Sequence, residues 1–143
     1  MATLKEVMST DIVTVTLQDN AFEIATKMKQ HDIGFIPVVE GKKLIGVVTD
    51  RDLVIRGYAN KQSGSVAVDQ VITRDVITAS PETSIDEAAK MMASNKIRRL
   101  PIVENGELLG VVAIGDLAVR QKFEDEAGEA LSEISEQHVS AKL

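Results

Sequence analysis

The sequence predicts an α+β protein with α/β-type layers, in which two copies of one β-α-β-β-α unit pack through their sheets around a pseudo-twofold axis. Residues 7–56 align with residues 71–120 at a constant offset of 64 without a gap, and 17 of the 50 positions are identical. Each copy also repeats the same order of apolar runs, turn residues and helix-start signals. A unit of about 50 residues buries too little surface to be stable alone, so we expect the copies to pack together.

The first half of each copy contains a short predicted strand followed by a helix. Ser84 and Glu87 have the spacing of a capping box at the start of the second helix, and Asn20 and Glu23 form a weaker version at the first. Apolar residues at positions i, i+3, i+4 and i+7 predict one buried stripe on each helix. The predicted strands are 13–15 and 76–79, and the stripes are Ala21, Ile24, Ala25 and Met28, and Ile85, Ala88, Ala89 and Met92.

The second half of each copy contains two further strands and the start of a second helix. Pro37 and Pro101 have no amide hydrogen to donate, so we expect them at a sheet edge or at the start of a strand. A second helix is expected to begin near residues 50–52 and 115–116. The predicted strands are 36–39 and 44–48 in the first copy, and 100–103 and 108–113 in the second.

The chain is therefore expected to have three parts. Residues 1–63 hold the first repeat with a short polar linker, and residues 64–120 hold the second repeat. Residues 121–143 carry two lysines against six acidic residues, so 2 − 6 = −4 of the net charge lies there, with apolar residues at helical spacing. This acidic segment is expected to form an amphipathic helix that either covers the second repeat or docks a partner.

The composition excludes several classes of protein. The 143 residues are 44% hydrophobic and 3% aromatic, and 16 Lys+Arg against 22 Asp+Glu give a net charge of −6. The absence of cysteine excludes disulfides and thiolate metal sites, and the apolar runs are too short to span a membrane. An acidic chain with few aromatic residues is poorly suited to nucleic acid. We expect a cytoplasmic protein with neither a nucleic-acid nor a membrane partner.

The residues that recur in both copies resemble a known family. Each copy has a Pro-apolar-Val strand followed by the pattern Leu-apolar-Gly-Val-Val-x-x-x-Asp-Leu, at 44–53 and 108–117. This double pattern over residues 3–120 is similar to a tandem pair of CBS domains, called a Bateman module, in a standalone prokaryotic protein. The resemblance implies a regulatory or energy-sensing module that binds an adenosine-containing ligand (AMP, ADP, ATP or S-adenosylmethionine) in a cleft between the repeats. It further implies a homodimer, no required cofactor and no enzyme activity.

Thr49 and Asp52 match the ribose-binding pattern of the family, Gly-x-x-Ser/Thr-x-x-Asp, which begins here at Gly46. A carboxylate at a helix start can accept hydrogen bonds from a vicinal diol, and a threonine hydroxyl can add another. The same spacing is also that of a helix-capping box. Ribose binding and helix capping therefore both remain open at this position, and they can hold in different ligand states.

The second copy departs from the ribose pattern. Ala113 stands where the hydroxyl belongs, although Asp116 is retained. We therefore expect a second, weaker site at Asp116, Ile12 and Val13, or a purely structural role for Asp116.

The resemblance also implies that basic residues just before the proline strand of one copy face the ribose aspartate of the other. The second copy has Arg98 and Arg99 there, whereas the first has Gly34 and Phe35. Arginine suits a phosphate because its planar guanidinium donates two parallel hydrogen bonds. Adenine is placed by the resemblance near Val76 and Ile77. The predicted ligand-binding residues are Thr49, Asp52, Val76, Ile77, Ile97, Arg98, Arg99 and Pro101.

Each of these residues also has a simpler interpretation. The arginines can form a solvated basic turn, and the apolar residues are equally expected in a core strand. His31 and His138 have no partners at metal-ligand spacing, and no catalytic set is apparent, so neither a metal site nor an enzyme is expected. The alternative hypothesis is a ligand-independent interaction or dimerisation module with a vestigial nucleotide site and a protein partner that the sequence does not identify.

Overall fold

The computed structural model describes residues 2–118, and the predicted acidic helix at 121–143 lies outside them. The described chain forms two compact units. Unit 2 comprises Ile12–Val76 and Gly106–Leu108, and unit 1 comprises residues 2–11, 77–105 and 109–118. Each unit therefore combines most of one repeat with the first residues of the other repeat. No helix within residues 2–118 is long and apolar enough to cross a membrane.

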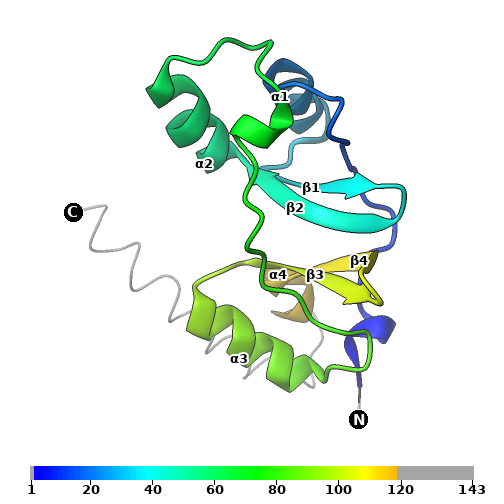
Figure 1. The fold of residues 1–143 in the computed structure, drawn as a ribbon. Coiled ribbons are helices and arrows are strands. Elements are labelled where there is room, and N and C mark those ends of the chain that lie inside the picture. Colours follow the sequence, from blue (N-terminus) through cyan, green and yellow to red (C-terminus); the bar gives the residue numbers. More distant parts are fainter. Residues whose placement is uncertain (1, 119–143) are drawn as a thin grey trace, which may run out of the picture. The chain divides into compact units, whose positions relative to one another are not determined.

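Unit 2 is built on an antiparallel hairpin (Figure 1). Strands β1 (Phe35–Glu40) and β2 (Lys43–Thr49) pair from Phe35↔Thr49 to Glu40↔Lys43, and Gly41 turns between them with a φ of +63°. Lys43 pairs in turn with Glu107. The helical segments of unit 2 are α1 (Ala21–His31), α2 (Asp50–Asp52), η2 (Leu53–Gly57, with π-helical bonding), η3 (Tyr58–Asn60) and η4 (Val68–Gln70).

Unit 1 contains the corresponding elements of the second repeat. They are η1 (Leu4–Glu6), α3 (Ile85–Asn95), β3 (Arg99–Glu104), β4 (Glu107–Ala113), whose first residues belong to unit 2, and α4 (Ile114–Ala118). Strands β3 and β4 are neighbours in the sheet. The N-terminal segment contributes Ala2 and Leu4 to the unit 1 core, as Val68, Val71 and Ile72 contribute to that of unit 2. Both cores therefore contain side chains from the beginning of the other repeat or from the residues just before it.

The strands predicted at 13–15 and 76–79 are wrong, because each is reduced to a single parallel bridge. Val15 pairs with Val38, where the Val15 N–H donates to the Pro37 carbonyl and the Val39 N–H donates to the Val15 carbonyl. The next bond of a parallel ladder would need an N–H from Pro37, which proline lacks. Ala79 pairs with Ile102 in the same way beside Pro101. The prolines thus lie inside β1 and β3 and stop the neighbouring ladder.

The two helix caps are reversed in strength relative to the sequence prediction. Asn20 and Glu23 form the complete capping box, with the Glu23 N–H 2.9 Å from Asn20 Oδ1 and the Asn20 N–H 3.0 Å from Glu23 Oε1. At α3 only the bond from the Glu87 N–H to Ser84 Oγ, 3.1 Å, is formed among the described contacts. Glu87 is exposed, so its carboxylate is open to solvent and does not need the backbone N–H of the cap as a partner.

The predicted apolar stripes differ in how completely they are buried. All four stripe residues of α3 are buried, as expected. On α1 Ile24 and Met28 are buried, whereas Ala21 is half-buried and Ala25 is exposed. The stripe prediction is therefore wrong at Ala25, because α1 turns a narrower face to its core and a methyl group gains little from burial.

Two glycines at equivalent positions of the repeats allow the chain to approach a strand closely. A Cβ on Gly46 of β2 would lie 2.5 Å from the Thr73 carbonyl oxygen and 2.8 Å from two Ile72 side-chain carbons. A Cβ on Gly110 of β4 would lie 2.7 Å from Met8 Sδ and 2.9 Å from the Ser9 carbonyl oxygen. Contacts this close require glycine, so each glycine allows the first residues of the other repeat to pack against its strand.

We predict that Gly46→Ala lowers the free energy of unfolding by about 1–3 kcal/mol, because the methyl group must displace backbone atoms. Gly115→Ala is the matched control, since its Cβ would meet nothing within 4 Å and the residue lies in α4. Urea denaturation of both variants measures the difference. Equal midpoints for the two variants would contradict the proposed close approach.

Candidate functional site

Thr49 and Asp52 form a closed capping box at the junction of β2 and α2. The Asp52 N–H donates to Thr49 Oγ1 at 3.1 Å, and the Thr49 N–H donates to Asp52 Oδ2 at 3.0 Å. Both residues are partly buried. The helix-capping interpretation of this motif is thus observed directly, and it places the carboxylate and the hydroxyl at the same helix start.

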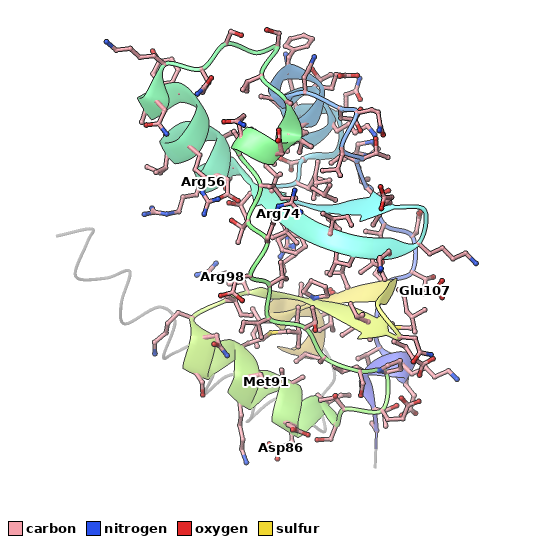
Figure 2. All side chains as sticks on the ribbon, in the orientation of Figure 1. Arg56, Arg74, Asp86, Met91, Arg98 and Glu107 are labelled. Atoms are coloured by element: carbon pink, nitrogen blue, oxygen red, sulfur yellow. The ribbon has the colours of Figure 1, made fainter. Side chains whose placement is uncertain are left out.

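The Asp52 carboxylate has two further partners from elsewhere in unit 2. The Thr73 hydroxyl lies 3.1 Å from both Asp52 Oδ1 and Asp52 Oδ2. Arg56, which is labelled in Figure 2, lies one turn further along the helical segment. Its Nε is 3.7 Å from Asp52 Oδ1, and its Nη1 donates to the Ile72 carbonyl oxygen. The Asp52 side chain is only 13% exposed, whereas the Arg56 side chain is 48% exposed. A partly buried carboxylate is thereby surrounded by donors.

Sequence reasoning did not identify Thr73 or Arg56 as part of this arrangement. The sequence did contain a signal. Arg56 is identical to its counterpart 64 residues later, and the residue that corresponds to Thr73 in the first repeat, Ser9, also carries a hydroxyl group. The contact of Thr73 with Asp52 depends on the close approach at Gly46, which a linear pattern does not reveal.

The equivalent position of unit 1 is built differently. Asp116 is exposed, and its Oδ2 accepts a bond from the Ala113 N–H at 3.3 Å. Ser9 pairs with Val111 through two backbone bonds, as Thr73 pairs with Val47, but no bond from its hydroxyl to Asp116 is found among the described residues. Of the other residues predicted for the weaker site, Ile12 and Val13 are half-buried in unit 2, and Val13 packs against its core.

The predicted phosphate residues lie at the start of β3 in unit 1. Arg98 and Arg99 are both exposed, and the Arg98 carbonyl accepts a bond from the Ile114 N–H at 2.9 Å. The first repeat has the same bond, from the Asp50 N–H to the Gly34 carbonyl, at 3.0 Å. A Cβ at Gly34 would lie 2.7 Å from Asp50 Oδ2, so the exposed Asp50 side chain would have to shift to admit a side chain there.

The remaining predicted ligand residues divide between core and surface. Pro101 is buried in β3, and Ile97 packs against the core of unit 1. Val76 is half-buried in unit 2, and Ile77 in unit 1 is 39% exposed. Ile97 and Pro101 therefore contribute to packing within unit 1, while Ile77 presents an apolar side chain to the surface of its unit, and their predicted contact with a ligand stays a prediction. Within residues 2–118 no group of three or more His, Asp or Glu side chains has an arrangement that could hold a metal ion.

Comparison with known proteins identifies the family. The chain matches the CBS domain family twice, over residues 4–57 and 68–121. This protein belongs to the CBS domain family. The two matches make it a tandem CBS pair, which is a regulatory module.

Individual relatives agree with this assignment. The chain is 42% identical over 139 residues to the CBS domain-containing protein YhcV of Bacillus subtilis, covering 97% of this chain and 99% of YhcV. The structure of AcuB from Vibrio cholerae is similar with a TM-score of 0.78 and 25% identity, covering 90% of this chain and 96% of AcuB. The CBS pair of MJ0100, solved with 5′-methylthioadenosine and S-adenosylmethionine, has a TM-score of 0.73 and 26% identity, covering 82% of this chain and 98% of that pair.

We predict that Thr73→Val lowers the free energy of unfolding by about 1.5–3 kcal/mol, because the charged, partly buried carboxylate of Asp52 loses the hydrogen bond that the Thr73 hydroxyl donates. The exposed Thr78 offers a control of the same chemistry, and Thr78→Val should change stability by less than about 0.5 kcal/mol. Chemical denaturation of the two variants provides the measurement. A Thr73→Val variant as stable as Thr78→Val would rule out the contact with Asp52.

Proposed function

We propose that this CBS pair is a non-catalytic sensor that binds an adenosine-containing ligand, namely AMP, ADP, ATP or S-adenosylmethionine. In this proposal Asp52 accepts hydrogen bonds from the ribose diol and Thr49 contributes its hydroxyl. The adenine lies against Val76 and Ile77, and Arg98 and Arg99 take the phosphate, as the family resemblance implies. The ligand shifts a conformational or oligomeric equilibrium that a protein partner reads.

The observation that supports this proposal most is the arrangement around Asp52. A carboxylate that is 13% exposed and accepts bonds on both oxygens has the geometry that a vicinal diol requires. The solved complex of the MJ0100 pair with two adenosine derivatives supports the ligand class. The differences at Ala113 and Asp116 support one strong half-site and one weak half-site in the chain.

A thermal shift assay tests the ligand class. A ligand present at 100 times its Kd adds about 2.7 kcal/mol to the free energy of unfolding, or several degrees in Tm. We expect a shift with at least one of AMP, ADP, ATP and S-adenosylmethionine. No shift with any of the four would contradict the proposed function.

The two aspartates separate the strong half-site from the weak one. Asp52→Ala is expected to abolish the ligand-dependent shift, while Asp116→Ala leaves most of it, because Asp116 is exposed and lacks a hydroxyl neighbour at position 113. Each variant is compared with its own Tm without ligand, so that loss of the helix cap does not count as loss of binding. Equal losses in the two variants would show that the half-sites are equivalent.

The arginines are tested by removing the phosphate from the ligand. Calorimetric titration with AMP and with adenosine measures the contribution of the phosphate to binding. We expect Arg98→Ala or Arg99→Ala to weaken AMP about tenfold or more and adenosine much less, since each loses a charge-assisted bond to phosphate. Equal weakening of both ligands would assign the arginine to a structural role.

A second candidate function is a ligand-independent interaction module, and one observation favours it. In the described structure the Asp52 carboxylate is already satisfied within the protein. The segment beyond it exposes three large apolar side chains, Val54, Ile55 and Tyr58, of which Tyr58 is 84% exposed. These residues suit a contact with a protein, including a second copy of this chain in the homodimer that we propose. Partner capture that is indifferent to both nucleotide and Asp52→Ala would support this second function.

A further inference from the structure

Arg56 joins two segments of unit 2 that are distant in the sequence. It lies in the π-helical segment η2, where its guanidinium contacts Asp52 at one end and the Ile72 carbonyl at the other. π-helical turns are rare and occur frequently at functional sites. Because Ile72 precedes Thr73, Arg56 fixes the same stretch of backbone that carries the hydroxyl bound to Asp52.

The two oxygens of Asp52 are held by different groups. The Thr49 N–H binds Oδ2, and Arg56 lies beside Oδ1 at 3.7 Å. The Thr73 hydroxyl lies between them, 3.1 Å from each. A vicinal diol needs both oxygens at the same time, so it needs the carboxylate in one fixed rotation.

We propose that Arg56 is a positioning residue that makes this half-site select ribose over 2′-deoxyribose. This inference rests on the proposed function and assigns its sugar specificity. Arg56 holds the carboxylate plane and the Ile72–Thr73 backbone together, so that two hydroxyls of a ribose replace the single hydroxyl of Thr73. A 2′-deoxy ligand supplies only one hydroxyl, which replaces the Thr73 hydroxyl and adds no further hydrogen bond to Asp52.

The Asp116 carboxylate of unit 1 lacks the fixed orientation that we infer for Asp52. Asp116 is exposed, and the only described partner of its carboxylate is the Ala113 N–H. A carboxylate held at one point and open to water rotates freely and has no fixed pair of oxygens to offer. We therefore expect sugar selectivity to come from the Asp52 half-site.

The experiment compares AMP with 2′-deoxy-AMP, and ATP with 2′-deoxy-ATP, by calorimetric titration of the 143-residue chain. The wild-type chain should prefer the ribonucleotide about tenfold or more, since the 2′-deoxy analogue lacks one hydrogen bond to a charged group. Arg56→Gln should reduce that preference to less than about threefold. A variant that only weakened the fold, or only lost a phosphate contact, would weaken both nucleotides equally and keep their ratio.

Two further variants complete the test. Arg51→Gln removes the same charge from the exposed arginine next to Asp52 and should keep the wild-type ratio. Arg56→Lys keeps the charge but has a single ammonium nitrogen in place of the planar guanidinium, so it should lose most of the preference for ribose over 2′-deoxyribose. Arg56→Lys also provides the measurement if Arg56→Gln does not fold, as judged by circular dichroism.

The outcomes separate this inference from the proposed function. A wild-type chain that binds AMP and ATP no better than their 2′-deoxy analogues overturns the inference. An Arg56→Gln or Arg56→Lys variant that keeps the full wild-type preference for the ribonucleotide also overturns the inference. Either result leaves the proposed function intact. The proposed function itself fails when none of the four adenosine ligands gives a thermal shift.

Discussion

The close approach of the Ile72–Thr73 backbone to β2 at Gly46 is the constraint on which the rest of unit 2 depends. Two bonds between Val47 and Thr73, of 2.9 and 2.8 Å, hold this approach, and a side chain at position 46 would prevent it. The second repeat uses the same device at Gly110, where Ser9 pairs with Val111. The first residues of each repeat are therefore held by the other repeat. As a consequence, the repeat in the sequence and the compact unit in space are not the same set of residues.

This constraint also determines the chemistry at Asp52. Once Thr73 lies beside β2, its hydroxyl reaches a carboxylate that already caps α2, and Arg56 closes the arrangement from the next turn. One carboxylate thus serves as a helix cap and as a joint between two segments. Each hydrogen bond to a charged group contributes about 1.5–3 kcal/mol. In the proposed complex a diol that displaces the Thr73 hydroxyl exchanges one such bond for two, so the net gain is smaller than the new contacts alone suggest.

The repeat predicted much of the fold, because apolar periodicity and turn residues act locally. Strands β1–β4, helices α1 and α3 and the start of α2 all lie where the sequence placed them. The predictions are wrong where a contact between distant parts of the chain overrides the local sequence pattern. The strand at 13–15 fails because Pro37 lacks the N–H that a second rung requires, and Ala25 is exposed because of how α1 faces its core. Thr49 and Asp52 followed from their spacing, but Thr73 and Arg56 depend on a contact made across 21 and 16 residues and were not predicted.

The carboxylates of Asp52 and Asp116 differ in their electrostatic environment as well as in the residues around them. Asp52 is 13% exposed, so its charge must be stabilised by hydrogen bonds from the protein or from a ligand, because water reaches it poorly. Asp116 is exposed and is solvated without help, so the loss of the hydroxyl at Ala113 costs it little. A hydrogen bond to the first carboxylate is stronger than one to the second, since it acts in a medium of lower dielectric constant, although at Asp52 a ligand hydroxyl would replace the hydroxyl of Thr73. The difference in burial between the two aspartates is therefore the physical basis on which we propose one strong and one weak half-site.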